Sequence, residues 1–368
     1  MPIPFFDLHR QYQSIKSEVD DVIGKVFTRS QFTGGPAVSD FEKQFAKCIR
    51  ATHCISTGNG TDALFLILKA LDLPVGSEVI VPAWGCIASA EPVSLAGFKL
   101  VFCDVDPQFY TIDLQSAQKK ITENTRAIIA VHLYGQAAPV MQLKALCDRY
   151  HLHLIEDCAQ AHFTLENGKP VGNFGVAAAF SFYPTKNLGA YGDAGCVVTS
   201  QSDLAEKVRR LSNHGALHKN DHVLIGTNSR MDALQAAVLS VKLRHLEHWN
   251  KRRVDIASHY TEALSAIDGL TVPQVRPGTK HTFHIYCICT NRRDELKKYL
   301  VARGIETAVH YPLGLPFTQA YQHFKLTEAD YPVTSSLQRE VLSLPVFPEL
   351  TSEEVTFICS GIQHFFSR

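Results

Sequence analysis

The sequence lacks the features that would direct the protein to a membrane, a nucleic acid or a secretory route. No uninterrupted apolar run approaches the roughly 20 residues that a membrane-spanning helix needs. Acidic and basic residues balance at 36 each, so no overall electric field favours nucleic acid or an anionic lipid surface. Asp7, His9 and Arg10 interrupt the start of the chain, where a secretory signal would carry an apolar segment. We therefore expect a cytoplasmic protein that binds neither membranes nor nucleic acids.

The chain also lacks the residue spacings typical of metal and redox sites. None of its ten cysteines forms a C-x-x-C pair, and many lie in apolar runs, which predicts reduced, buried thiols. His214, His218 and His222 are spaced by four residues, but Gly215 and the polar residues 219–221 oppose a regular helix there. No H-E-x-x-H motif occurs. We expect no metal site, and we interpret the histidine segment as a loop.

What the sequence does contain is the alternation of an α/β protein. With 368 residues, the chain is long for one core and suggests two packed units. Strand-like runs alternate with helical stretches, which is typical of a parallel, doubly wound sheet. These runs are residues 78–81, 99–105, 127–133, 153–156, 177–182 and 196–199.

A long amphipathic pattern over residues 232–264 predicts a helix that connects a large domain to a small one. Beyond it, residues 284–289 resemble a strand and residues 294–303 a helix, which favours a smaller α+β unit. The predicted division is therefore a large α/β domain at residues 1–245 and a small C-terminal α+β domain at residues 246–368.

Lys186 is the first candidate for a reactive group. It lies in the connection between two predicted strands, flanked by Pro184 and Gly189, which favour a fixed irregular backbone. An amine held there and partly shielded from water can lose its proton and condense with an aldehyde. Because most lysines are solvated surface charges, this interpretation needs support from the rest of the chain.

Asp157 gives such support because it ends a predicted strand. In open α/β sheets, ligands bind at the carboxyl ends of strands, where a carboxylate is well placed for chemistry. Pyridoxal phosphate needs an ionised carboxylate to keep its pyridine nitrogen protonated. The alternative is that Asp157 caps a helix beginning within residues 158–161. The residues alone leave both interpretations open.

Small residues at positions 56–64 precede a predicted buried helix, and a helix N-terminus of this kind can hold a phosphate. Gly58, Gly60 and Ala63 also fit the dinucleotide pattern G-x-G-x-x-A. That pattern expects an acidic residue about 20 positions later, at the end of the next strand. The next strand leads into residues 82–84 without an acid, so the dinucleotide hypothesis is disfavoured.

The order of these motifs resembles the DegT/DnrJ/EryC1/StrS family of sugar aminotransferases. The shared segments are residues 4–8, 58–64, 104–107, 131–136, 156–162, 181–195, 228–232, 304–305 and 310–312, so the resemblance runs nearly end to end. It implies the aspartate aminotransferase-like fold type I and pyridoxal 5'-phosphate as cofactor. It further implies a nucleotide-linked keto sugar as substrate and glutamate as amino donor.

The resemblance implies roles for individual residues. Lys186 resembles the lysine that forms the Schiff base and moves protons, and Asp157 the partner of the pyridine nitrogen. Gln160 matches a hydrogen-bond partner of the ring hydroxyl. The expected phosphate cradle consists of Gly60, Thr61 and Ser181.

Other matches concern a partner subunit and the substrate. Asn228 matches a residue that reaches the phosphate from the neighbouring subunit, which predicts a homodimer with shared active sites. Arg230, His310 and Tyr311 are candidates for anchoring the donor carboxylate or the nucleotide. Their alternative role is that of exposed polar residues or charges at helix ends.

Two features bear on the substrate and on departures from the family. Cys86 stands where relatives usually stack an aromatic ring on the cofactor, and the nearby Trp84 confuses the register, so stacking is assigned to neither. Residues 192–193 and 228–232 resemble relatives that act on 3-keto sugars, which predicts conversion of dTDP-3-keto-6-deoxyhexose to dTDP-3-amino-3,6-dideoxyhexose. The alternatives are a 4-keto sugar aminotransferase, a sugar dehydratase with histidine in place of the lysine, and a non-catalytic regulator.

Overall fold

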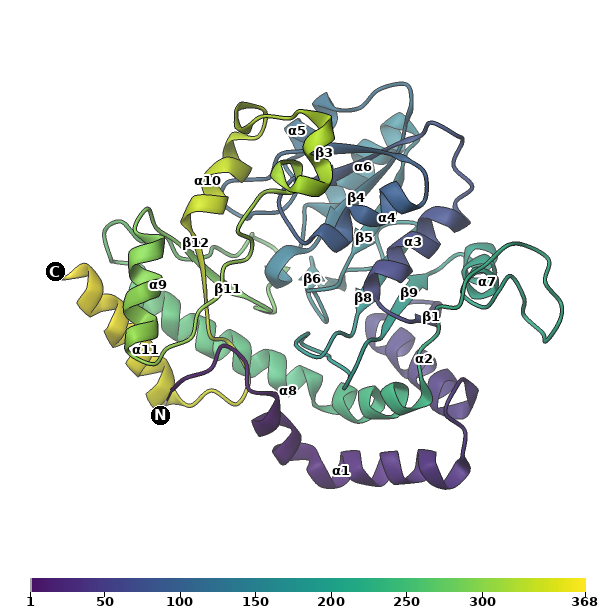
Figure 1. The fold of residues 1–368 in the computed structure, drawn as a ribbon, viewed down its shortest axis with the longest axis horizontal. Helices are drawn as coiled ribbons and strands as arrows, with labels where there is room; N and C mark the ends of the chain where they lie inside the picture. Colours follow the sequence, from purple (N-terminus) through teal and green to yellow (C-terminus); the bar gives the residue numbers. More distant parts are fainter. Residues whose placement is uncertain (1) are drawn as a thin grey trace.

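The computed structural model describes residues 2–368 of the chain. Within these residues, seven strands form a central sheet (Figure 1). They are β1 (His53–Thr57), β2 (Glu78–Pro82), β3 (Lys99–Cys103), β4 (Thr125–Val131), β5 (His153–Asp157), β8 (Ala177–Ser181) and β9 (Gly195–Thr199). Their order is β1-β9-β8-β5-β4-β2-β3, and β2, β3, β4, β5 and β8 run parallel to one another.

β9 runs antiparallel to both of its neighbours, β1 and β8. Parallel neighbours need a long crossover, usually through a helix, whereas the described residues 182–194 between β8 and β9 contain no helix. The sequence pattern predicts β9 as a strand of a parallel sheet, so the expected direction of β9 is wrong. The pattern also misses β1, which is short and partly polar. The direct connection between β8 and β9 is the segment that carries Lys186.

Helices cover both faces of the sheet. One face packs against α3 (Gly60–Ala70), α4 (Glu91–Leu95) and α7 (Ser202–Leu211), and the other against α2 (Gly35–Ile49), α5 (Leu114–Lys119), α6 (Val140–Tyr150) and α8 (Ala233–Leu264). Successive strand residues point to opposite faces. Val79 and Val81 therefore join the core on the α3 side, whereas Ile80 joins the core on the α6 side. This arrangement confirms the predicted doubly wound α/β fold.

α8 extends from the sheet to a second packed unit (Figure 1). Its last turns, with Ile256 and Tyr260, pack against β11 (Tyr286–Cys289), β12 (Val341–Leu344), α9 (Arg293–Ala302) and α11 (Ser352–Phe366). Ile3 joins this unit because its N–H donates to the carbonyl of Gly304 at 2.7 Å. The boundary expected between residues 245 and 246 falls within α8, and the division into two domains stays a prediction.

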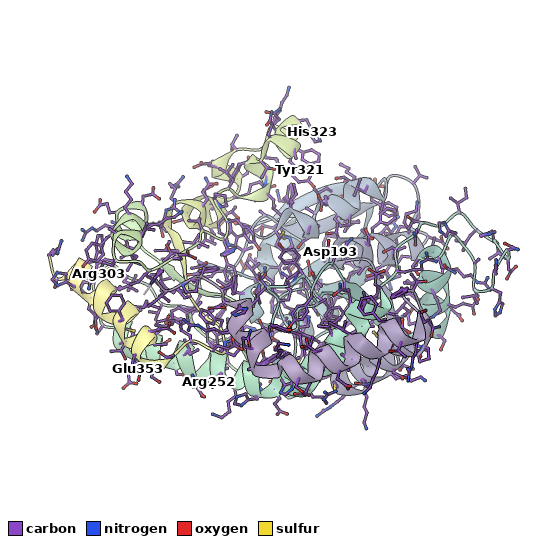
Figure 2. All side chains as sticks on the ribbon, turned by 60° about the horizontal axis from the view of Figure 1, so that its bottom comes forward. Asp193, Arg252, Arg303, Tyr321, His323 and Glu353 are labelled. Atoms are coloured by element: carbon purple, nitrogen blue, oxygen red, sulfur yellow. The ribbon has the colours of Figure 1, made fainter. Side chains whose placement is uncertain are left out.

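The remaining elements are α1 (Leu8–Arg29), α10 (Pro332–Glu340), β6 (Leu165–Glu166), β7 (Lys169–Pro170), β10 (Thr279–Lys280), and the 3-10 turns η1 (Ile87–Ser89), η2 (Leu133–Gly135), η3 (Leu315–Phe317), η4 (Gln319–Phe324) and η5 (Glu328–Asp330). α1 lies along α8. Figure 2 shows Arg303 and Glu353 toward one end of the molecule and Asp193 near the middle of the viewed face. Within residues 2–368, no helix is long and apolar enough to cross a membrane.

Candidate active site

A cavity of about 460 Å³ opens where two strands end and a helix begins. Asp157 is the last residue of β5, Ser181 the last of β8, and Gly60 the first of α3. β5 and β8 are parallel neighbours, so their carboxyl ends meet at one edge of the sheet, where α/β proteins bind ligands. The other polar residues that line the cavity are Asn59, Thr61, Asp62, Cys86, Ser89, Gln160, Tyr183, Lys186 and Asp193.

The N-terminus of α3 faces this cavity. The side chain of Asn59 caps the helix by accepting a hydrogen bond from the N–H of Asp62 at 2.8 Å. Gly60 is needed here, because an added Cβ would lie 2.6 Å from the Cβ of Ser181. The glycine therefore lets the end of β8 approach the first turn of α3. The helix N–H groups and the hydroxyl of Ser181 can then act on one anion.

Asp157 is held by two donors. The hydroxyl of Ser89 donates to Oδ2 at 2.6 Å, and the N–H of Ala159 donates to Oδ1 at 3.0 Å. The described residues 158–161 form a turn and begin no helix, so the helix-capping alternative is wrong. Because a carboxylate offers about four acceptor sites, Asp157 retains acceptor capacity for a further donor in the cavity.

Glu156, the neighbour of Asp157 on β5, is fully buried and has a different role. Burial alone would raise the pKa of its carboxyl, but hydrogen bonds from His132 and from backbone N–H groups lower it. The N–H of Ala138 donates to Nδ1 of His132 at 3.0 Å, which leaves Nε2 to donate to Glu156 at 3.1 Å. The backbone donors are Gly172, Phe174 and Gly175. Cys158 lies close to both side chains, but these hydrogen bonds already account for Glu156 and His132 as a structural pair.

Lys186 lies on the wall of the cavity. Its N–H donates to the carbonyl of Tyr183 at 2.8 Å, which fixes its backbone in a turn. Burial lowers the pKa of its amine, although Cys86 and Asp157 partly oppose this shift. A larger fraction of the amine is therefore neutral at a given pH than for a solvated lysine.

Two buried histidines, His162 and His284, and the half-buried His310 lie near Lys186. Burial lowers the pKa of His162 to about 3 and that of His310 to about 4, and the charge of Lys186 acts in the same direction. The pKa of His284 is also lowered, by burial and then by the same lysine. These rings are uncharged at neutral pH, so Lys186 is the basic group of this part of the site.

Gln160 is fixed at both ends of its amide. Its Oε1 accepts from the N–H of Tyr134 at 2.6 Å, and its Nε2 donates to the hydroxyl of Tyr311 at 3.0 Å. The hydroxyl of Tyr134 in turn donates to the carbonyl of His310. Gln160, His310 and Tyr311, which the sequence singled out separately, thus belong to one hydrogen-bond network.

The structure shows which of Trp84 and Cys86 faces the cavity. Trp84 is buried, and its indole N–H donates to the hydroxyl of Tyr134 at 3.1 Å. Its ring packs edge-on against Tyr311. Cys86 instead lines the cavity. A thiol therefore faces the site at this position, and the neighbouring tryptophan lies behind it.

Asn228 and Arg230 lie elsewhere. Among the described residues, neither lines the cavity of its own chain, and both are exposed. Arg230 donates to Oδ1 of Asn213 at 3.0 Å and borders a separate hollow. Ser229, between them, is buried and donates to Asp62 at 2.6 Å. The predicted contact of Asn228 with a phosphate in a second subunit stays a prediction.

Sequence reasoning missed three residues that support the site. Ser89 fixes Asp157, Tyr134 fixes Gln160, and Ser229 accepts from the N–H of Gly58 at 3.0 Å. Ser89 is a single hydroxyl in a stretch without a motif of its own. The one available signal is that Tyr134 and Ser229 fall inside segments that match the family.

The residues fit pyridoxal phosphate on the geometry alone. The start of α3 with Ser181 offers donors for a phosphate, Asp157 retains acceptor sites for a pyridinium N–H, and Lys186 has the lowered pKa that condensation with an aldehyde requires. A mostly parallel sheet with this constellation at its carboxyl edge defines a pyridoxal-phosphate-dependent transferase of fold type I.

Comparison with known proteins narrows this class. The model of the DegT/DnrJ/EryC1/StrS aminotransferase family matches residues 13–363. A pleiotropic regulatory protein of Geobacillus stearothermophilus is 42% identical over 100% of this chain and 99% of its own length. The dTDP-3-amino-3,4,6-trideoxy-alpha-D-glucose transaminase of Streptomyces venezuelae is 40% identical over 100% of this chain and 97% of its own.

Among solved structures, that of S. venezuelae DesV in complex with a ketimine intermediate matches with a TM-score of 0.98. It is 40% identical, and the match covers 100% of this chain and 99% of that one. The chain belongs to the DegT/DnrJ/EryC1/StrS aminotransferase family. It is a pyridoxal-phosphate-dependent sugar-nucleotide aminotransferase.

Proposed function

We propose that the enzyme transfers the amino group of glutamate to dTDP-3-keto-6-deoxyhexose and releases dTDP-3-amino-3,6-dideoxyhexose. The observation that carries the chemistry is the convergence of Lys186, Asp157 and the start of α3 on one cavity. The 3-position and the dTDP group are supported by the name of the S. venezuelae relative. Residues 192–193 and 228–232, which resemble 3-keto enzymes, favour the same position.

The side chains divide the work of transamination. Bound pyridoxal phosphate draws electrons from the carbon that carries the amino group. Asp157, oriented by Ser89 and Ala159, holds the proton of the pyridine nitrogen in place. Nζ of Lys186 removes the proton from Cα of glutamate and, in the second half of the reaction, delivers a proton to C3 of the sugar. Its lowered pKa provides the neutral amine that the first of these transfers needs.

The binding residues act around this centre. Gly60, Thr61 and Ser181 donate to the cofactor phosphate, with the helix dipole of α3 adding to the attraction. Gln160 is held by Tyr134 and Tyr311 so that its amide meets the ring hydroxyl. His310 and Tyr311 belong to the same network, but neither is among the described residues that line the cavity, so their contact with the substrate is part of the proposal.

We also infer a homodimer with shared active sites. Asp62, Asp157 and Asp193 line the cavity, whereas Lys186 is the single basic side chain among the described lining residues. The cofactor phosphate, the two phosphates of the dTDP group and a donor carboxylate need further donors. Asn228 and Arg230 are exposed and, among the described residues, do not line the cavity of their own chain. A second copy of the chain brings such residues to the site.

Mixed dimers test the shared site. Lys186→Ala and Asn228→Ala chains are purified separately, and each homodimer should be impaired. After subunit exchange, a mixed dimer has one site with both native residues and should regain part of the activity. A protein that is monomeric in solution would contradict the shared site. So would mixtures that gain no activity although mass spectrometry shows that the subunits have exchanged.

The cofactor's absorbance tests the reaction itself. Glutamate should convert the visible band of the holoenzyme to the pyridoxamine form, and a dTDP-3-keto sugar should restore it. Lys186→Ala should lose the band, whereas Lys251→Ala, which removes an exposed lysine of α8, should keep it. Restoration by the 4-keto isomer, or by UDP- or GDP-linked sugars in preference to dTDP, would overturn the proposed substrate. A band that no amine bleaches would overturn the transaminase reaction.

A further inference from the structure

Two polar side chains of α8 are buried completely beneath the segment that follows Lys186. Lys242 is 0% and Asn250 1% exposed. Lysine is rarely buried without a partner, because desolvating its charge is costly. Neither residue lines the catalytic cavity, so the reaction described above does not account for them.

Asn250 holds the residue next to Lys186. Its Oδ1 accepts from Nδ2 of Asn187 at 2.8 Å, and its own Nδ2 donates to the carbonyl of His162 at 2.9 Å. The amide of Asn187 is further fixed because Nδ1 of His284 lies 3.1 Å from its Oδ1. The ring of His284 is neutral, so a nitrogen that carries its proton can donate to this oxygen.

Lys242 holds the same segment two residues later. Its Nζ donates to the carbonyl of Gly189 at 2.6 Å and lies 4.4 Å from the ring centroid of Tyr191. Burial lowers the pKa of Lys242 to about 7. The amine carries hydrogens in both protonation states, so it can donate to Gly189 on either side of that pH.

The backbone between these two anchors has little freedom. An added Cβ on Gly189 would lie 2.2 Å from the carbonyl oxygen of Pro184, which shows how tightly the turn closes. The N–H of Ala190 donates to the carbonyl of Phe182 at 2.8 Å, closing the loop that contains Lys186. A shift of either anchor is therefore transmitted to the lysine.

We propose that Lys242 and Asn250 are positioning residues, which clamp residues 187–189 on α8 and thereby set the direction of Nζ of Lys186 toward the cofactor aldehyde. The inference rests on the proposed role of Lys186. It assigns to α8, which also joins the sheet to the second unit, a direct influence on the catalytic amine.

The test compares two forms of the cofactor on the apoenzyme. Pyridoxal phosphate can condense with Lys186, whereas pyridoxamine phosphate cannot, so the ratio of their dissociation constants isolates the contribution of the lysine bond. The variants are Lys242→Met and Asn250→Ala, with Lys251→Ala as the exposed control on the same helix. Each variant loses the one buried hydrogen bond that ties its residue to residues 187–189. This loss predicts that each variant binds pyridoxal phosphate about tenfold more weakly and pyridoxamine phosphate nearly as well as the wild type does.

Conservative variants separate positioning from general damage. Asn250→Asp keeps an acceptor for Asn187 but loses the donor to the carbonyl of His162, so it should restore only part of the ratio. If Lys242→Met does not fold by circular dichroism, Lys242→Gln, which keeps a donor, replaces it and should show a smaller loss. An equal loss of both ligands, or no loss of either, would overturn the clamp.

Lys186→Ala removes the lysine bond altogether. The ratio of the two dissociation constants in this variant therefore defines the complete loss of the lysine's contribution. If Lys186→Ala binds both ligands as the wild type does, the proposed role of the lysine fails. If only the reference variant loses the ratio while both clamp variants keep it, the clamp alone fails. The two hypotheses are thereby distinguished in one set of titrations.

Discussion

The cofactor end of the cavity and the loop of residues 213–230 are built from opposite kinds of structure. At the cofactor end, Asp157 and Ser181 terminate buried strands, and Gly60 begins a capped helix. In the loop, Asn228 and Arg230 are exposed, and the apolar side chain of Ile225 is 96% exposed. The groups at the cofactor end are held by partners within the chain, whereas Asn228, Arg230 and Ile225 present their side chains outward.

The difference shows where rigidity comes from. The backbone hydrogen bonds of the sheet hold the ends of its strands in place. A functional group at a strand end therefore has a fixed position before any ligand binds. A loop side chain acquires a fixed position from whatever packs on it. The reactive groups of this enzyme can therefore be identified within one chain, whereas the binding roles predicted for Asn228 and Arg230 depend on what covers the loop.

The largest effect is expected from Asp157→Asn at the cofactor end. The amide keeps the shape and the contact with Ser89 but removes the negative charge that stabilises a protonated pyridine. By analogy with loss of one preorganised electrostatic contact, kcat should fall about 10²–10³-fold, or roughly 3–4 kcal/mol. Steady-state kinetics with glutamate measures this. A fall below threefold would show that Asp157 is not the partner of the ring.

The next effect concerns Glu156, one residue away on the same strand. Glu156→Gln leaves His132 and three backbone donors facing a neutral amide in a fully buried site. Breaking a buried pair of this kind is expected to lower the free energy of unfolding by about 3 kcal/mol. Urea denaturation measures the loss. The folded fraction should retain much more activity than Asp157→Asn, and equal loss of kcat in both would contradict the distinction.

These two acids also show what sequence can and cannot predict. Both are carboxylates in a strand that periodicity identifies, and the position of Asp157 at its end pointed to the site. The role of Glu156 depends on residues 172–175, and the fixing of Asp157 depends on Ser89, which is brought close by the fold. Alternation along a strand predicts which face a residue takes, but not which distant donor meets it there.

The same limit applies to the direction of a strand and to the hydrogen-bond partners of a side chain. The pattern predicts β8, β9 and the reactive connection between them, but the antiparallel return of β9 follows from the absence of a helix within the described residues 182–194. The clamp by Lys242 and Asn250 is invisible in sequence, because a polar residue on an amphipathic helix is usually assigned to its solvated face.

A graded effect, which grows with each pH unit, is expected from pH acting on two buried histidines. His162 and His281 have pKa values lowered by burial to about 3, from an ordinary value of 6.5. Their contribution to stability is complete above about pH 6.5 and is lost as the pH falls toward 3, because the unfolded state binds the proton first. Each should reduce the free energy of unfolding by about 1.4 kcal/mol per pH unit within this window.

The check is urea denaturation of the wild type and His162→Phe between pH 6.5 and 4.5. Within the described residues neither ring nitrogen of His162 has a hydrogen-bond partner, and its ring lies 5.6 Å from those of Phe180 and Phe182. Phenylalanine fits this surrounding and cannot be protonated. The variant should therefore show a shallower pH dependence, and parallel curves would contradict the assignment.

The smallest effect is expected from Arg230→Ala in the loop. The guanidinium is exposed and donates to Asn213, so its removal leaves no buried charge behind. An exposed ionic contact between this guanidinium and an anionic group of the substrate would contribute about 0.2–1 kcal/mol. This corresponds to less than a tenfold change in kcat/KM. If Arg230 anchors substrate from a second subunit, KM should rise while kcat stays constant, and raised salt should reduce the difference from the wild type. A fall in kcat as large as that of Asp157→Asn would place the arginine at the reacting atoms and remove the contrast between the two regions.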